Sequence, residues 1–222
     1  MNWKQIIGQE KIIESLQDSI NKKRVSHAQL FLGEEGFGGL PLALAYAQEI
    51  LSQENPQAIQ KVERLNHLDL HFSFPIFSEK NQSLSKRYFE EWRGMILENP
   101  YASFDDWTEV LDAENKQFQI SVAEVEEFTK NFTLKSYEGG TKILILWRAD
   151  EMRTESSTTL LKFLEEPPEK TIIILLAENQ DFILPTILSR CQITEIPRID
   201  EETIINNLLE FIDVPFDDIV KV

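Results

Sequence analysis

Residues 30–45 read LFLGEEGFGGLPLALA, an apolar strand followed by a glycine-rich turn and then a helix. This order is typical of a phosphate-binding loop, whose motif is G-x-x-x-x-G-K-[ST]. The turn keeps both motif glycines, Gly33 and Gly38, but Gly39 stands in place of the lysine and Leu40 in place of the hydroxyl residue. That lysine neutralises the outer phosphates, and the hydroxyl binds magnesium. The sequence therefore predicts the scaffold of a nucleotide-binding protein without two of its working side chains.

Strand patterns alternate with helix patterns along the rest of the chain. The runs KILILW (142–147) and TIIILLA (171–177) are continuously apolar, which predicts strands buried on both faces. Strands that alternate with amphipathic helices indicate an α/β fold, a mostly parallel sheet flanked by helices. Other strands are expected at residues 29–32, 66–74 and 192–196. Helices are expected at residues 9–24, 42–51, 84–97, 101–111, 121–131, 154–165, 183–190 and 201–213.

Composition and charge limit the class of protein. The chain has 222 residues, one cysteine and a formal net charge of −16. A single cysteine excludes an internal disulfide and a multi-cysteine zinc site. Neither a membrane-spanning apolar run nor a signal peptide is evident, so we expect a cytoplasmic protein with no membrane contact. The acidity serves solubility or docking against basic partners, and it argues against independent tight binding of DNA, which usually needs a basic surface.

The segment LLKFLEEPPEKTIIILLAENQDFILPTILSRC, residues 160–191, is the second strong signal. Its informative motifs are Leu160-Leu161-Lys162, Leu164-Glu165-Glu166-Pro167-Pro168, Leu184-Pro185 and Ser189-Arg190-Cys191. With the loop and the His27-Ala28 lead-in, their order and spacing resemble the clamp-loader branch of the AAA+ proteins, in particular the delta-prime family of bacterial DNA polymerase III. The likeness runs from residue 1 to about residue 213 and is weakest over 52–120.

The resemblance implies a domain organisation and a set of partners. It implies an AAA+ P-loop-type domain over residues 1–197, the start of a small helical lid domain over 198–222, and a collar domain absent from this chain. Such a fragment is expected to lose oligomerisation through the collar. The implied partners are the ATPase motor and delta-type subunits of a clamp loader. The sliding clamp is an indirect partner, and primed DNA would be reached only within the assembled complex.

The same resemblance implies a role for Arg190 in a neighbouring subunit. In the family, the arginine of Ser189-Arg190-Cys191 projects into the nucleotide site of the next subunit as a catalytic arginine finger. The alternative is a structural salt bridge at a helix end. Cys191 is expected to be a packing residue, because no histidine is near it in sequence. Asn179 sits near the family's phosphate-sensing position, where the resemblance implies a vestigial residue.

The family's acidic pair falls on residues without carboxylates. Counting back from Leu160 places that pair, which binds magnesium and orients the attacking water, on Trp147 and Arg148. Asp150 and Glu151 then follow on a turn, where we expect a solvated pair at a helix start. The resemblance thus implies a non-hydrolysing subunit of the DNA polymerase III holoenzyme, with ATP and magnesium bound by its neighbours. The residues of this degenerate loop are Gly33, Gly36, Gly38, Gly39 and Leu40.

Two alternatives remain open at this level. One is an active P-loop ATPase motor subunit of a clamp loader. The other is a metal-dependent hydrolase using His67, Asp69 and His71, which would share one face of a strand over 66–74. A polar strand face explains that spacing equally. The family's four-cysteine zinc module is missing, so no metal or cofactor is expected in this chain. Four aromatic residues are expected in the core rather than on a base-stacking surface: Trp92, Phe104, Trp107 and Phe118.

Overall fold

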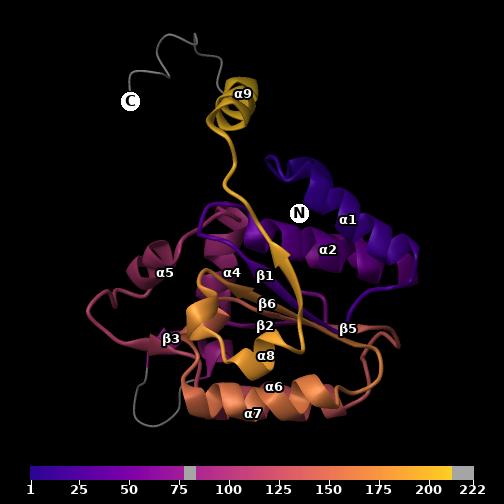
Figure 1. Ribbon diagram of the computed structural model, residues 1–222, viewed down its shortest axis with the longest axis vertical. Coiled ribbons are helices and arrows are strands. Elements are labelled where there is room, and N and C mark those ends of the chain that lie inside the picture. Colours follow the sequence, from indigo (N-terminus) through magenta and orange to yellow (C-terminus); the bar gives the residue numbers. More distant parts are fainter. Residues whose placement is uncertain (78–83, 212–222) are drawn as a thin grey trace.

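The computed structural model describes residues 1–77 and 84–211, and a five-stranded parallel sheet lies at its centre (Figure 1). In order across the sheet, the strands are β2 (Leu70–Ser73), β5 (Lys142–Leu146), β6 (Thr171–Ala177), β1 (Ala28–Leu32) and β7 (Gln192–Glu195). All four neighbouring pairs are parallel. The predicted α/β fold with a mostly parallel sheet is confirmed.

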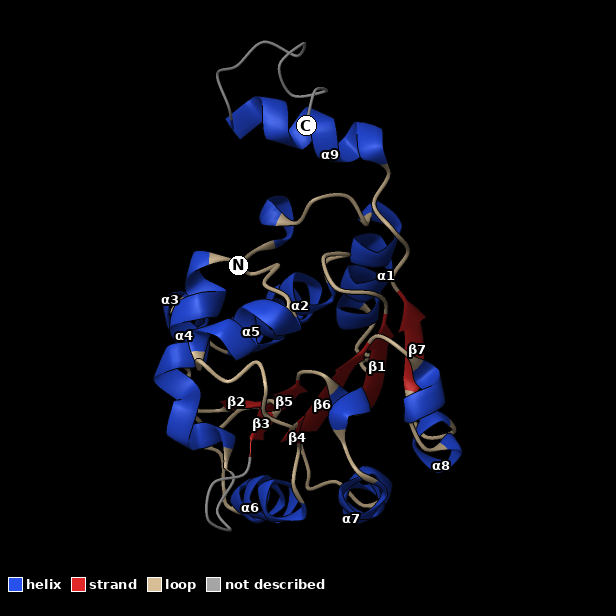
Figure 2. Ribbon diagram, turned by 90° about the vertical axis from the view of Figure 1, so that its left-hand side faces the viewer, coloured by secondary structure: helices blue, strands red, loops and turns tan. Residues whose placement is uncertain are grey.

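Helices cover both faces of the sheet (Figures 1 and 2). On one face lie α1 (Glu10–Asn21), α2 (Gly39–Glu54), α3 (Ala58–Glu63), α4 (Phe89–Glu98) and α5 (Phe104–Val110). On the other lie α6 (Val122–Thr133), α7 (Thr154–Glu165) and α8 (Pro185–Leu188). Four short 3₁₀ turns are described: η1 (Trp3–Gln5), η2 (Ser85–Tyr88), η3 (Ala149–Glu151) and η4 (Gln180–Phe182). None of the described helices is both long and apolar enough to cross a membrane.

The apolar runs of β5 and β6 reflect burial on two faces. Successive side chains of a strand point to opposite sides. Ile143 and Ile145 accordingly belong to the apolar core on the side of α1 to α5, whereas Leu144 and Leu146 belong to the core on the side of α6 to α8. Each face thus receives its own apolar core, and the sheet is held as a rigid layer. Its strands all point their carboxyl ends to the edge where β1 runs into the glycine-rich loop.

The start of α6 contains a helix cap and a buried carboxylate. Ser121 caps α6 by accepting a hydrogen bond from the Glu124 amide. The Glu124 carboxylate does not return to the cap, however. It is buried and accepts hydrogen bonds from the hydroxyls of Ser73 and Ser85. Burial raises the pKa of this carboxyl, although the bonds from Ser85 and Ser73 oppose the rise. Glu124 therefore ties η2 to the end of β2.

The segment between the loop and β5 differs most from the prediction. Of the strand expected over 66–74, only β2 forms, because residues 66 and 67 are irregular and residues 68 and 69 form a turn. Helix α3 and a small antiparallel sheet, β3 (Ile76–Phe77) with β4 (Phe118–Gln119), were not predicted. The expected aromatic core is confirmed: Trp92 and Trp107 are fully buried around Phe74.

Beyond β7 an extended segment leads to α9 (Glu201–Phe211), which stands apart from the layers around the sheet (Figures 1 and 2). This helix agrees with the one predicted from residue 201. Residues 212 and 213 of that prediction, like residues 212–222 of the expected lid domain, lie outside the described residues. The boundary expected at residue 197 stays a prediction.

Candidate functional site

The glycine-rich loop joins β1 to α2 at the carboxyl edge of the sheet. Gly36 and Gly38 have φ angles of 79° and 97°, a left-handed conformation that glycine adopts without strain. Gly33 faces the chain just after β7, where an added Cβ would lie 2.6 Å from the Ile196 carbonyl oxygen. The glycines therefore shape the loop and allow two backbones to approach closely. Helix α2 then begins at Gly39.

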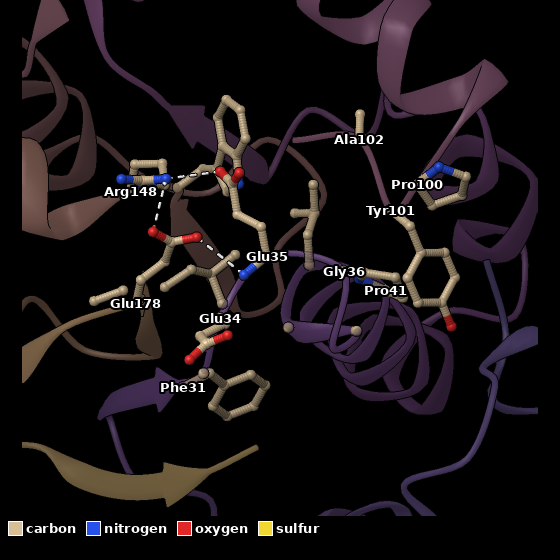
Figure 3. A pocket seen from close by; sticks show the side chains of 17 residues that line it. Phe31, Glu34, Glu35, Gly36, Pro41, Pro100, Tyr101, Ala102, Arg148 and Glu178 are labelled. Carbon is tan, nitrogen blue, oxygen red and sulfur yellow. Dashed lines mark hydrogen bonds and ion pairs between the residues drawn. The ribbon is translucent and has the colours of Figure 1, made fainter. Parts of the chain in front are cut away.

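A small hollow lies beside this loop (Figure 3). It is lined by the loop, by residues 100–102, and by the residues that follow β5 and β6. Its volume is about 50 Å³, whereas sites for small molecules commonly measure about 300–1,000 Å³. Leu40 is buried in the core below it, and so is Trp147. Neither side chain carries a carboxylate or a hydroxyl group.

Arg148 fills the polar side of the hollow, and Figure 3 shows it beside carboxylates of the loop and of the segment after β6. Two further carboxylates come from η3. The Nη1 atom of Arg148 lies 2.7 Å from Glu35 of the loop and 3.2 Å from Glu178, which follows β6. Its Nη2 atom lies 3.1 Å from Glu151, and its Nε atom lies 3.4 Å from Asp150. The Arg148 side chain is only 12% exposed. We call these five residues the Arg148 cluster.

Backbone groups also bind to this cluster. Glu178 Oε1 accepts a hydrogen bond of 2.9 Å from the Glu35 amide, and Glu35 Oε1 accepts one of 2.7 Å from the Phe104 amide. The Arg148 guanidinium lies 4.9 Å from the centre of the Phe104 ring. Arg148 itself has a φ of 59°, which is uncommon for a residue with a side chain. The Arg148 cluster therefore joins the loop, the ends of β5 and β6, and the start of α5.

The electrostatics of the cluster follow from burial and from charge pairing. Burial opposes the charge on Arg148, but Asp150, Glu178 and Glu35 outweigh it and raise the pKa of the guanidinium. Burial also raises the pKa of Glu151 and of Glu178, and Arg148 partly offsets both rises. With four carboxylates around one guanidinium, the hollow favours cations and disfavours phosphates. The arrangement pairs charges internally, and it presents no free lysine or hydroxyl.

The prediction that Asp150 and Glu151 form a solvated pair is wrong. They do lie on the turn after β5, in η3, as expected. The Asp150 side chain is only 5% exposed, and its Oδ2 atom accepts a hydrogen bond from the Glu178 amide. The left-handed turn at Arg148 brings its guanidinium back over the two carboxylates that follow it. Sequence spacing alone does not reveal such a turn.

Arg190 lies elsewhere, just beyond the end of α8. Its Nη2 atom lies 2.5 Å from Glu165 Oε1 at the end of α7, and its Nη1 atom donates to the Thr186 carbonyl oxygen at 2.8 Å. The Arg190 side chain is 36% exposed. The salt bridge at a helix end, which the sequence left as an alternative, is thus present in the single chain. Arg190 is outside the group of residues that line the hollow.

Two other residues that the sequence analysis considered, Cys191 and Asn179, are also outside the set that lines the hollow. Cys191 is half-buried against the core on the α7 side, and burial raises the pKa of its thiol to about 11. The thiol is therefore protonated at neutral pH. The Asn179 side chain accepts a hydrogen bond from the Asp181 amide and caps η4. The residue that reaches the loop from the end of β6 is its neighbour, Glu178.

The expected strand face with His67, Asp69 and His71 does not form, because β2 begins at Leu70. The Asp69 carboxylate accepts hydrogen bonds from the amides of Tyr137 and Glu138. The His71 ring packs 4.9 Å from the Phe132 ring, and burial lowers its pKa to about 4. Among the described residues, no three His, Cys, Asp or Glu side chains gather as metal ligands would.

Glu35 and Glu178 are site residues that the sequence did not predict. Both positions carried a signal, since Glu35 lies inside the loop and Glu178 directly follows a buried strand whose carboxyl end meets that loop. Their contacts with Arg148 span 113 and 30 positions of the chain. That these two carboxylates pair with Arg148 becomes visible only when the folded chain brings the three residues together.

Comparison with known proteins gives a family and several relatives. DNA polymerase III subunit delta' of Bacillus subtilis is 28% identical over 95% of this chain and 54% of its own length. Subunit tau of the same organism is 27% identical over 95% of this chain and 32% of its own length. The delta' subunit of Pseudomonas aeruginosa is 34% identical over 37% of this chain and 25% of its own length.

This chain thus spans about half the length of the Bacillus delta' relative. A solved structure of a DNA polymerase III gamma subunit-related protein from Thermotoga maritima is 16% identical, with a TM-score of 0.46 over 89% of this chain and 49% of that one. Residues 8–200 match the model of the family described as DNA polymerase III, delta subunit. With most of its length matched, the chain belongs to this DNA polymerase III delta-subunit family.

Proposed function

We propose that this chain is a non-hydrolysing, delta-prime-like subunit of a bacterial clamp loader. It would join ATPase motor and delta-type subunits in a ring that opens the sliding clamp and loads it onto primed DNA. Its contribution would be to hold Arg190 against the nucleotide bound by a neighbour. Family membership and the Bacillus delta' relative support this assignment. The expected location is the cytoplasm, where bacterial DNA is replicated.

The observation that carries this proposal is the position of Arg148. A hydrolysing P-loop protein needs free carboxylates at this strand end, to bind magnesium and to orient water. Directly after β5, this chain has the buried Trp147 and then Arg148, whose guanidinium is paired with four carboxylates. The loop adds Gly39 and Leu40 in place of the lysine and the hydroxyl. At the loop and after β5, the chain therefore lacks both the phosphate-binding side chains and the carboxylate pair that hydrolysis needs.

The competing function is an ATPase motor subunit. The Bacillus tau subunit is nearly as similar to this chain as the delta' subunit is. The residues at the loop and after β5 argue against that alternative. Magnesium-dependent ATP hydrolysis by the purified chain would support it and would overturn our proposal.

Arg190 suits a role in a neighbour's site because its present contacts are weak. Its guanidinium is partly exposed and is bound to one exposed carboxylate, one carbonyl oxygen and, at 3.4 Å, the Ser189 hydroxyl. Exposed ion pairs of this kind stabilise a fold by only about 0–1 kcal/mol. A phosphate with a planar match to the guanidinium can therefore compete for it. The net charge of −16 suits docking against basic partner surfaces rather than direct binding to DNA.

The decisive experiment replaces Arg190 in the full-length protein, assembled with its partner subunits. In an assembly where only the neighbouring site can hydrolyse ATP, we expect Arg190→Ala to lower the rate about 10³-fold, as losses of arginine fingers do. Subunit assembly, followed by gel filtration, should be unchanged because Arg190 is exposed. Arg198→Ala is the matched control, since Arg198 is another exposed arginine paired with a glutamate. An unchanged rate with Arg190→Ala would exclude the finger role.

A further inference from the structure

One backbone donor of the loop, the Glu35 amide, already has an acceptor from within the chain. In phosphate-binding loops, backbone N–H groups donate to phosphate oxygens. Here the Glu35 amide donates to Glu178 Oε1 at 2.9 Å, and Figure 3 shows the Glu178 carboxylate turned toward the loop. This carboxylate takes a loop donor that a phosphate would otherwise use. Glu178 is therefore an internal anion at the loop.

Arg148 supplies the matching internal cation. In a working site, the loop lysine and magnesium would balance the charge of the phosphates. Arg148 Nη1 instead balances Glu178 and Glu35, at 3.2 Å and 2.7 Å. Asp150 Oδ1 is buried and has no hydrogen-bond partner within the described residues, and the Arg148 Nε atom lies 3.4 Å from it. Removal of the guanidinium would leave this carboxylate buried without a cation.

We propose that Arg148 and Glu178 form an internal substitute for a magnesium nucleotide, which fixes the shape of the loop and excludes nucleotide from it. The carboxylate satisfies the loop amide, and the guanidinium holds together the segments that a nucleotide would bridge. This inference goes beyond the proposed function because it concerns the chain alone and needs neither a ring nor a neighbour. The Arg190 experiment and the tests below can therefore fail separately.

Space and charge both act against an incoming nucleotide. The hollow measures about 50 Å³. A triphosphate would have to displace Glu178 from the Glu35 amide and separate it from Arg148. It would also approach Glu34, which lines the hollow beside Glu35. Repulsion between like charges is strong in a partly buried site, because solvent screens it less there.

The test is the thermal stability of Arg148→Met, which keeps the length and the apolar stem of the side chain but removes the charge. At about pH 7.5 we expect its melting temperature to fall by about 6–20 °C, as for other broken buried ion pairs. Arg148→Lys keeps the charge without the planar fork, so its loss should be smaller. Arg93→Met is the matched control, because Arg93 pairs with Glu90 and with the Arg64 carbonyl oxygen on the surface of α4.

The dependence of this loss on pH separates charge from packing. The groups that face Arg148 are Glu35 from the loop, Asp150 and Glu151 from η3, and Glu178 after β6. Burial raises the pKa of Glu151 and of Glu178, and Arg148 offsets part of both rises. Without Arg148 the folded form therefore binds more protons than the unfolded form does. Stability then increases as pH falls. We expect about half of the Arg148→Met loss to disappear at about pH 5.5.

Added magnesium offers a second readout. Millimolar magnesium chloride should raise the melting temperature of Arg148→Met, because a divalent cation can replace the lost charge among the carboxylates. Wild type and Arg93→Met should not respond. A loss that is the same at both pH values and unaffected by magnesium would overturn the proposal, since it would mean that Arg148 only fills space. If Arg148→Met does not fold, Arg148→Gln, which also removes the charge but keeps a polar side chain, carries the same comparison.

The wild-type chain tests the exclusion of nucleotide directly. Its melting temperature in millimolar magnesium and ATP should equal that in magnesium alone, because a ligand that binds the folded state raises the melting temperature. A rise of a few degrees would overturn the proposal, because the loop would then accept nucleotide despite the internal pair. Such a rise would leave the role of Arg190 in a neighbour's site unaffected.

Discussion

Two arginines of this chain, Arg148 and Arg190, are bound in opposite ways. Arg148 is 12% exposed and contacts four carboxylates at the loop, whereas Arg190 is 36% exposed and contacts one carboxylate at the end of α7. Breaking a buried pair typically costs about 3–5 kcal/mol, and breaking an exposed pair costs about 0–1 kcal/mol. Arg148 is therefore fixed within its own chain, and Arg190 is free to change partners. The difference separates a structural cation from one that can serve another molecule.

The surroundings of the two arginines explain this difference. Arg148 follows a central strand, where the ends of β5 and β6 and the loop converge from three sides. Arg190 precedes β7, an edge strand that pairs only with β1 among the described strands. An arginine at the centre of the sheet edge meets its own chain's carboxylates. The one at the border stays partly exposed and pairs with a single carboxylate.

The largest expected effect comes from restoring the loop motif with Gly39→Lys and Leu40→Thr. Leu40 is buried, so we expect the free energy of unfolding to fall by about 2–4 kcal/mol. Position 39 can hold a side chain, since an added Cβ would lie 3.5 Å from the Ile196 side chain. No magnesium-dependent ATPase should appear, because Arg148 still stands where a carboxylate is needed. Urea unfolding and a phosphate-release assay measure the two results.

Leu40→Thr alone is the control for that double variant. It should show the same loss of stability and likewise no hydrolysis. Robust turnover by the double variant would contradict the contrast between the two arginines, because the loop end would then be a working site. It would also show that the acidic pair is not located at Trp147 and Arg148. Loss of stability without ATP turnover would agree with a loop that does not accept nucleotide.

The sequence predicted the layers of this fold better than the contacts at its loop. Strand β6 and helix α7 agree with the predicted ranges at both ends, because continuous apolar runs and Pro167-Pro168 are strong local signals. The strands β3 and β4 have two residues each and form only through tertiary pairing, so no periodicity could reveal them. The local hydrophobic pattern was sufficient to predict the bounds of an element where that element is fully buried.

Within the site, the sequence identified positions but not partners. It placed Arg148 just beyond β5, as the structure does, and it treated Asp150 as solvated, which is wrong. The error follows from a left-handed turn at Arg148, a conformation that the residue type does not suggest. Glu35 and Glu178 were missed because their significance depends on segments that meet only in the folded chain.

A medium effect is expected where the loop approaches β7. Gly33→Ala would place a Cβ 2.6 Å from the Ile196 carbonyl oxygen, and two backbones would have to move apart. We expect a loss of about 1–3 kcal/mol in the free energy of unfolding. Gly94→Ala is the control, because among the described residues nothing lies within 4 Å of the added Cβ in α4. That change should stabilise the chain by about 0.5–1 kcal/mol, and equal losses at both glycines would contradict a tightly fixed loop.

The smallest effect should come from Glu165→Gln, which removes the charge that now holds Arg190. Because both side chains are exposed, we expect the free energy of unfolding to fall by less than about 1 kcal/mol. The loss should shrink further at high salt, since ions screen exposed pairs. Urea unfolding at low and high salt measures both quantities, with Glu127→Gln at the exposed Lys86 pair as the control. A loss comparable to that of Arg148→Met would mean that Arg190 is also fixed within its chain. A guanidinium held so firmly could not be transferred to a neighbour's phosphate, so the smallness of this effect is what the proposed role of Arg190 requires.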